Sequence, residues 1–97
     1  MLNQNSRILV VDDMGTMRKI IINMLKDFGF IHFVEVSDAD RAWEILATAS
    51  PAIDMIISDV NMPGMSGVDF LKAVRSEPRF AKLPFIFLTS DADMKTV

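Results

Sequence analysis

The stretch ILVVDDM, residues 8–14, places four aliphatic residues directly before two adjacent carboxylates, Asp12 and Asp13. A continuous aliphatic run of this kind is typical of a strand that is buried on both faces of a parallel sheet. The two carboxylates repel each other and resist leaving water, so their position requires compensation by a cation or by hydrogen-bond donors. The stretch therefore predicts a central strand that ends in a charged site.

Short apolar runs alternate with helically spaced apolar residues along the rest of the chain. We expect strands at residues 8–11, 33–36, 55–58 and 85–88. Turn and capping residues indicate where the helices between them begin and end. The first runs from Gly15-Thr16 to Gly29, the second from Ser37 or Asp38 to Ser50-Pro51, and the third closes before Glu77-Pro78.

The first expected helix has apolar residues at i, i+3, i+4, i+7, i+8 and i+11, which form one stripe. The stripe consists of Met17, Ile20, Ile21, Met24, Leu25 and Phe28. The inward residues expected in the other two helices are Ala42, Ile45, Leu46 and Ala49, then Val68, Leu71 and Val74. These positions predict which helix faces pack against the sheet.

Strands that alternate with helices predict right-handed βαβ units and an open parallel α/β sheet. In such sheets, ligands bind outside the carboxyl ends of the strands, near the point where the strand order switches. Asp12 and Asp13 follow the first expected strand, Asp59 follows the third, and Thr89 follows the fourth. We expect these carboxylates and this hydroxyl to share one rim of the sheet.

The composition argues against several classes of protein. The chain has 97 residues, a net charge of −3 and no cysteine. It therefore favours a single domain, residues 1–97, without a basic surface for nucleic acid, a thiolate nucleophile or a disulfide framework. Polybasic segments and apolar runs of membrane-spanning length are absent from these residues. We expect a cytoplasmic protein that contacts neither nucleic acid nor membrane.

The residues expected on the rim suggest a specific chemistry. Asp12, Asp13 and Asp59 form an oxygen-only cluster that repels itself in the absence of a cation. Mg²⁺ suits such a cluster, because it takes one or two carboxylates, keeps several waters and recruits phosphate oxygens. A carboxylate is also a competent nucleophile towards phosphorus, and the Thr89 hydroxyl can donate to a phosphoryl oxygen. The rim therefore predicts a cation site with phosphoryl chemistry.

Three motifs resemble the receiver domain of bacterial two-component response regulators, closest to the stand-alone CheY type of chemotaxis. They are VVDDMGTMR at residues 10–18, SDVNMPGMSG at 58–67 and FLTS at 87–90, in the order and spacing of that family. The resemblance runs from about Arg7 to the last residue. It implies a three-layer flavodoxin-like (CheY-like) open parallel sheet with helices on both faces.

The resemblance also implies a role for each rim residue. Asp59 corresponds to the aspartate that accepts a phosphoryl group from a histidine kinase. Asp13 corresponds to the principal Mg²⁺ ligand, Asp12 to a residue that orients the metal through water, and the Asn61 backbone carbonyl to a further ligand. Thr89 corresponds to the switch hydroxyl. A domain of this kind catalyses only its own phosphorylation and dephosphorylation, and it changes its contacts with a downstream target such as the flagellar motor switch.

The C-terminal region departs from the family. Asn61 and Asp91 match positions that tune the lifetime of the phosphoryl group, and Ser90 stands where the family usually has a small residue. The lysine and the aromatic switch residue of the family's fifth strand have no counterpart among these 97 residues. Lys95 falls in an incipient helix that begins at residues 90–93 and does not replace that lysine. We expect an incomplete domain, lacking the fifth strand and last helix, that binds metal better than it signals.

An incomplete domain has consequences for its surface. Without a fifth strand, the strand at residues 85–88 becomes an exposed edge, and such edges invite pairing. Without the last helix, part of the apolar stripe at residues 17–28 lacks cover. We hypothesise that the fragment dimerises, swaps elements or is only loosely folded.

Three alternative functions compete with the receiver interpretation. A Mg²⁺-dependent phosphohydrolase with Asp59 as nucleophile needs an acid/base two residues later, where Asn61 stands. A nucleotide-binding domain needs a Gly-rich phosphate loop after the first strand, where DDMGT stands instead. A pseudo-receiver that serves only for protein contacts is disfavoured by the complete set of aspartates with Thr89, although the missing lysine keeps it open.

Two cationic residues follow the acidic pair closely in the sequence. We interpret Arg18 and Lys19 as solvated residues of the first helical turn, with a lowering of the site's negative potential as the alternative. The single histidine, His32, is interpreted as a surface or half-buried residue, because nothing in the sequence pairs with it.

Overall fold

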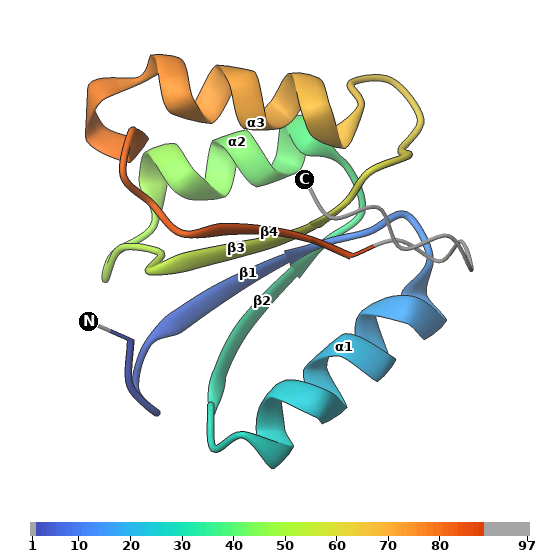
Figure 1. The fold of residues 1–97 in the computed structure, drawn as a ribbon, viewed down its shortest axis with the longest axis vertical. Coiled ribbons are helices and arrows are strands. Elements are labelled where there is room, and N and C mark those ends of the chain that lie inside the picture. The colour runs from blue at the N-terminus through green and yellow to red at the C-terminus, as the bar shows by residue number, and fades with distance from the viewer. Residues whose placement is uncertain (1, 89–97) are drawn as a thin grey trace.

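The chain forms a four-stranded parallel sheet between two layers of helices (Figure 1). The computed structural model describes residues 2–88. Its elements are β1 (Arg7–Val11), α1 (Gly15–Asp27), β2 (His32–Val36), α2 (Ala39–Thr48), β3 (Met55–Asp59), α3 (Gly67–Ser76), the 3-10 helix η1 (Pro78–Phe80) and β4 (Phe85–Leu88). All four predicted strands are present, each within one residue of its expected ends.

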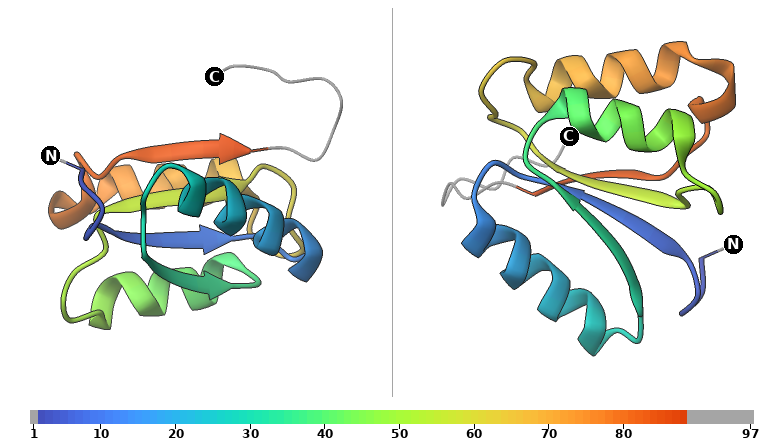
Figure 2. Two further views of the ribbon diagram at one scale, coloured as in Figure 1. Left: turned by 90° about the horizontal axis from the view of Figure 1, so that it is seen from below. Right: turned by 180° about the vertical axis from the view of Figure 1, so that it is seen from behind.

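The strand order of the sheet is β2-β1-β3-β4, and every pairing is parallel. The order therefore reverses between β1 and β3, which are neighbours. One face of the sheet is covered by α1 and the other by α2 and α3 (Figures 1 and 2). The predicted three-layer flavodoxin-like α/β fold is confirmed. Within the described residues β4 pairs only with β3, so it is an edge strand as predicted.

Alternate residues of β1 belong to two separate cores, one on each face of the sheet. Leu9 and Val11 join the cluster beneath α2 and α3, and Ile8 and Val10 join the cluster beneath α1. All four side chains are fully buried. A strand with both faces buried requires a continuous aliphatic run, which is the pattern seen at residues 8–11.

Helix α1 buries a narrower face than its apolar stripe predicts. Its buried residues are Ile21, Ile22 and Leu25. The prediction of an inward face is wrong for Ile20, Met24 and Phe28, which are exposed, Phe28 at 81%. Because residues four apart lie on one side of a helix, these three form an exposed apolar row along α1. Within the described residues, part of the stripe therefore lacks cover, and the attribution of this to a missing last helix stays a prediction.

The glycine that the sequence indicated follows the C-terminus of α1, after the last helical residue Asp27 and the C-cap residue Phe28. Gly29 has a φ of 98°, a left-handed conformation that a residue without Cβ adopts at low cost. Its N–H donates to the Lys26 carbonyl at 2.9 Å, and the Phe30 N–H donates to the Leu25 carbonyl at 3.1 Å. These two bonds satisfy carbonyls that the helix end leaves open, and they turn the chain into β2.

Side-chain caps determine where α2 and α3 begin. Asp38 accepts from the Arg41 N–H at 2.8 Å, and Ser66 accepts from the Asp69 N–H at 3.2 Å. In α3 the buried residues are Gly67, Phe70 and Val74. The prediction that Val68 faces inward is wrong, because this residue is exposed. The inward face of α3 lies on the side of Gly67, Phe70 and Val74, away from that side chain.

Some predictions lie outside the described residues. They concern Thr89, Ser90, Asp91, Lys95 and the incipient helix at residues 90–93. Within residues 2–88, the structure contains no helix that is both long enough and apolar enough to span a membrane.

Candidate functional site

Three carboxylates converge at the carboxyl ends of β1 and β3. Asp12 and Asp13 directly follow β1, and Asp59 is the last residue of β3. One carboxylate oxygen from each residue lies within 4.8 Å of the other two. The reversal of strand order places these two strand ends side by side, so the three predicted residues share one rim, as expected.

Asp12 is buried and anchored by its backbone and its side chain. Only 2% of its surface is exposed. Its N–H donates to the Val36 carbonyl at 3.2 Å, and its carbonyl accepts from Arg18 Nη1 at 2.6 Å. Its Oδ1 accepts from the Met14 N–H at 2.9 Å, which closes the turn into α1. Asp13, by contrast, is exposed, so one carboxylate of the pair is buried and the other faces solvent.

Asp59 is also buried, with 6% of its surface exposed, and it has polar contacts of its own. Its Oδ1 accepts from the Asn61 N–H at 3.4 Å, and its backbone carbonyl accepts from Ser58 Oγ at 2.9 Å. The loop after β3 returns to α3 through a bond of 2.8 Å from the Gly67 N–H to the Val60 carbonyl. The carboxylate therefore lies at the base of this loop, next to the Asn61 N–H.

Burial and like charge act together on the pKa of Asp12. Loss of solvation raises this pKa most, and the Met14 N–H bond lowers it. The negative charges of Asp59 and Asp13 raise it further. Burial and the two neighbouring carboxylates thus make the ionised form of Asp12 less favourable than in water, and a bound cation would offset the repulsion between the carboxylates.

The sequence matches the family model described as the response regulator receiver domain, over residues 8–97. The chain belongs to this family. The receiver domain is also 43% identical over 86 residues to the chemotaxis protein CheY of Pseudomonas aeruginosa, an alignment that covers 89% of this chain and 68% of the relative. It is 38% identical over 96 residues to the chemotaxis protein CheY-3 of Vibrio cholerae, covering 99% of this chain and 72% of the relative.

Solved structures of receiver proteins have the same fold. The chemotaxis response regulator CheY4 of Vibrio cholerae superposes with a TM-score of 0.78 at 34% identity, over 92% of this chain and 72% of that one. A response regulator receiver protein from Pseudomonas putida has a TM-score of 0.78 at 30% identity, over 95% and 74% of the two chains. The sheet order and the helix layers described above are thus those of this receiver family.

The donor set of the receiver domain fits a hard divalent cation. All three side chains offer oxygen, and the direct ligands of an octahedral Mg²⁺ lie about 3–4 Å apart. A cluster of carboxylate oxygens within 4.8 Å accommodates an ion held partly by direct ligands and partly through water. The exposed Asp13 leaves one side of the site open to solvent and to an incoming anion. Soft metals are not favoured, because the cluster offers neither sulfur nor imidazole.

Two residues that support the rim were not identified as such from the sequence. Arg18 was interpreted as a solvated residue, but its guanidinium contacts the Asp12 backbone. Gly67 was only part of a loop motif, but a Cβ at this position would collide with the Asp59 carbonyl oxygen. Both contacts join residues from different elements, so no local pattern indicates them.

Proposed function

We propose that this chain is a phosphoacceptor receiver domain that takes a phosphoryl group from a histidine kinase onto Asp59. The observation that carries the proposal is the convergence of Asp12, Asp13 and Asp59 at the point where the strand order reverses. The names of relatives that carry the word chemotaxis support a role in that process. The proposal includes a downstream protein target, such as the flagellar motor switch, and a cytoplasmic location for the exchange.

In the proposed reaction the Asp59 carboxylate attacks the phosphorus of a phosphohistidine. The Asp59 O–P bond forms as the P–N bond breaks, and the leaving imidazole takes up a proton from solvent. Bound Mg²⁺ would neutralise charge on the phosphoryl oxygens and reduce repulsion by the acidic rim. Asp12, Asp13, Asp59 and the Asn61 carbonyl are its proposed ligands, and Asp12 acts through water.

The residues of the chain have further roles in this proposal. The exposed Asp13 would offer a bound ion a carboxylate oxygen, and the buried Asp12 anchors the pair at the end of β1. The Asn61 N–H supports the Asp59 carboxylate. Thr89 is proposed to donate to the phosphoryl group, and Asn61 with Asp91 is proposed to tune access of water.

Intact mass spectrometry tests the proposal directly. The chain is incubated with acetyl phosphate and Mg²⁺, beside an Asp59→Asn control. We expect one added phosphoryl group in the parent protein and none in the control. An adduct that persists in Asp59→Asn would contradict the assignment of Asp59. No adduct on a parent protein that still binds Mg²⁺ would favour the pseudo-receiver, and steady release of phosphate from small phosphoesters would favour the phosphohydrolase.

The surface of the chain supports one further part of the proposal, association with a second copy. Ile20, Met24 and Phe28 form the exposed apolar row on α1, and Ile86 of the edge strand β4 is also exposed. Apolar side chains on a helix row, and beside a strand edge that is unpaired among residues 2–88, favour burial against another molecule. The proposed contact therefore involves α1, β4 or both.

A further inference from the structure

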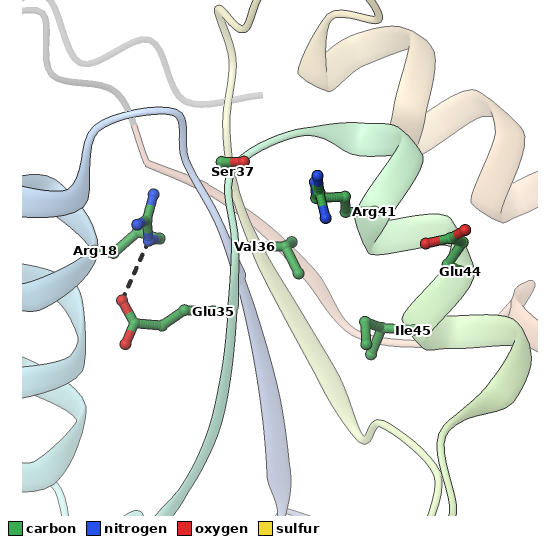
Figure 3. Close-up of a pocket in the computed structure, with 7 residues that line it drawn as sticks. All are labelled: Arg18, Glu35, Val36, Ser37, Arg41, Glu44 and Ile45. Carbon is green, nitrogen blue, oxygen red and sulfur yellow. Dashed lines mark hydrogen bonds and ion pairs between the residues drawn. The ribbon is translucent and has the colours of Figure 1, made fainter.

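Arg18 connects the acidic loop to the neighbouring strand β2. Its Nη1 donates to the Asp12 carbonyl oxygen at 2.6 Å, and its Nε pairs with Glu35 Oε1 at 3.2 Å. Figure 3 shows Arg18 reaching from α1 to Glu35 of β2, at one side of a surface pocket of about 360 Å³. The two side chains are 21% and 29% exposed, so the guanidinium is partly withdrawn from water and its bonds are screened less than those of an open surface pair.

The bond to the Asp12 carbonyl acts on both carboxylates of the pair. The peptide unit between Asp12 and Asp13 is planar, so a donor that holds its oxygen fixes the plane that joins the two residues. The orientation of this plane sets the backbone ψ of Asp12 and the φ of Asp13, and with them the directions of both side chains. A charged donor at 2.6 Å is at the strong end of hydrogen bonding.

Glu35 orients the guanidinium that makes this bond. The planar fork of arginine presents donors in fixed directions, so a partner on Nε determines where the Nη1 donor points. Lys19 Nζ also pairs with Glu35, at 3.0 Å, but its side chain is 71% exposed. Lys19 therefore has the same charge as Arg18 and the same acidic partner, Glu35. It differs in that none of the described hydrogen bonds joins it to Asp12.

We infer that Arg18, held by Glu35, is a positioning residue that sets the Asp12–Asp13 pair for Mg²⁺ binding. The inference rests on the proposed function and adds a residue to its machinery. A purely electrostatic role makes the opposite prediction. Removing a positive charge beside an acidic site strengthens the binding of a cation, whereas losing the positioning bond weakens it.

Calorimetric titration of the full chain with Mg²⁺ alone distinguishes the two roles. We expect Arg18→Met to raise the Kd for Mg²⁺ about tenfold, the usual scale for residues that orient metal ligands. Lys19→Met is the matched control, because it removes one positive charge and one Glu35 partner but no bond to Asp12. We expect its Kd to be unchanged or lower. Equal shifts in the two variants, or tighter binding by Arg18→Met, would overturn the inference.

A conservative variant adds a second discrimination. Arg18→Lys keeps the positive charge but cannot present two donors from a planar fork. It therefore retains the electrostatic effect of Arg18 in full but its positioning effect only in part. We therefore expect the Kd of Arg18→Lys to lie between those of the parent and Arg18→Met. Full recovery of the parent Kd in Arg18→Lys would contradict a positioning role that depends on the planar fork held by Glu35.

A measurement without metal separates this inference from the proposed function. The Met14 N–H is bonded to Asp12 Oδ1, so its hydrogen exchange reports the order of the acidic loop. We expect faster exchange at Met14 in Arg18→Met than in Lys19→Met, with similar rates elsewhere in α1. If the parent protein neither binds Mg²⁺ nor takes up a phosphoryl group, the proposed function fails. The exchange rate at Met14 still shows whether Arg18 orders the acidic loop. Equal exchange rates would overturn that role even where the parent protein is phosphorylated.

Discussion

The backbone of Gly67, the first residue of α3, lies directly against the carbonyl oxygen of Asp59, the last residue of β3. A Cβ at this position would also meet the ring of Phe87 and the Cα of Val60 at 3.0 Å. The close approach is accompanied by the bond from the Gly67 N–H to the Val60 carbonyl. The loop between β3 and α3 can return this tightly to the strand end because residue 67 has no side chain.

Gly67→Ala is therefore expected to destabilise the fold and to displace Asp59. Backbone atoms cannot give way as side chains do, so the cost is that of overpacking, about 1–3 kcal/mol in the free energy of unfolding. Urea denaturation measures the loss. Gly15→Ala is the matched control, because Gly15 is also the first residue of a helix and its Cβ would meet only the end of Arg18 at 3.4 Å. Equal stability of the two variants would contradict the close-packing argument.

Asp12→Asn is expected to stabilise the metal-free protein at neutral pH. Burial raises the pKa of Asp12 above its ordinary value of 3.8, so its stabilising contribution is present below that value and is lost as pH rises through the folded pKa. Asparagine keeps the acceptor for the Met14 N–H and removes the charge. In the presence of a chelator, we expect the free energy of unfolding of Asp12→Asn to exceed that of the parent protein by on the order of 1 kcal/mol. This difference becomes smaller below about pH 4.

Thermal denaturation with chelator and with Mg²⁺ measures both effects of Asp12→Asn. A gain of this size corresponds to about 4–8 °C in Tm for a domain of this length. Added Mg²⁺ should raise the Tm of the parent protein more than that of the variant, because the ligand set is weakened. A lower Tm of the variant in chelator would contradict the role of like-charge repulsion.

Glu35→Gln is expected to be less stable than the parent protein at neutral pH and equally stable at acidic pH. The hydrogen bond from Lys19 lowers the pKa of Glu35 below its ordinary value of 4.5, and that from Arg18 acts in the same direction. A lowered pKa means that the stabilisation is present above 4.5 and is lost as pH falls through the folded pKa. The difference at pH 7 should be at most about 1 kcal/mol, because the pair is partly exposed.

Chemical denaturation at a series of pH values measures this dependence. Glu44→Gln is the control, since Glu44 lines the same pocket and takes part in none of the ion pairs among the described residues. We expect the control to match the parent protein at every pH. If Glu35→Gln were less stable than the parent protein by the same amount at pH 3 as at pH 7, the charge of Glu35 would not be the cause of the difference.

Phe28→Lys is expected to reduce association of the chain. The Phe28 side chain is exposed at the end of the apolar row on α1, so a charge there opposes burial against a second copy. Sedimentation velocity over a concentration series measures the effect. Asn23→Lys adds the same charge to an exposed residue of α1 outside the row and serves as the control. A parent protein that stays compact and monomeric at all concentrations would contradict the proposed association.

Local patterns in the sequence predicted most of the architecture. The aliphatic run at residues 8–11 indicated a strand buried on both faces, and the alternation of strands and helices indicated the parallel sheet. Glycine at position 29 marked the end of α1, because a left-handed residue is needed there. The aspartates that follow the strands predicted the rim, since the carboxyl ends of parallel strands lie at the same edge.

Helix faces were predicted less well, because helical periodicity identifies an apolar side but not how much of it has a partner. In α1 the stripe was wide enough to include both the buried Ile21 and the exposed Phe28. In α3 the spacing pointed to Val68, but the position of the helix over the sheet buries Phe70. Which part of an apolar face is covered depends on its neighbours in space.

The sequence by itself determined the succession of strands and helices along the chain, the acidic pair after β1 and the third carboxylate after β3, because each depends on neighbouring residues. Only the tertiary structure decided that Arg18 of α1 bonds to the Asp12 backbone while pairing with Glu35 of β2, and that Gly67 touches Asp59. Such contacts join elements whose distance and orientation are set by packing of the whole sheet. For that reason the residues that carry the charge were visible in the sequence, and those that hold them in place were not.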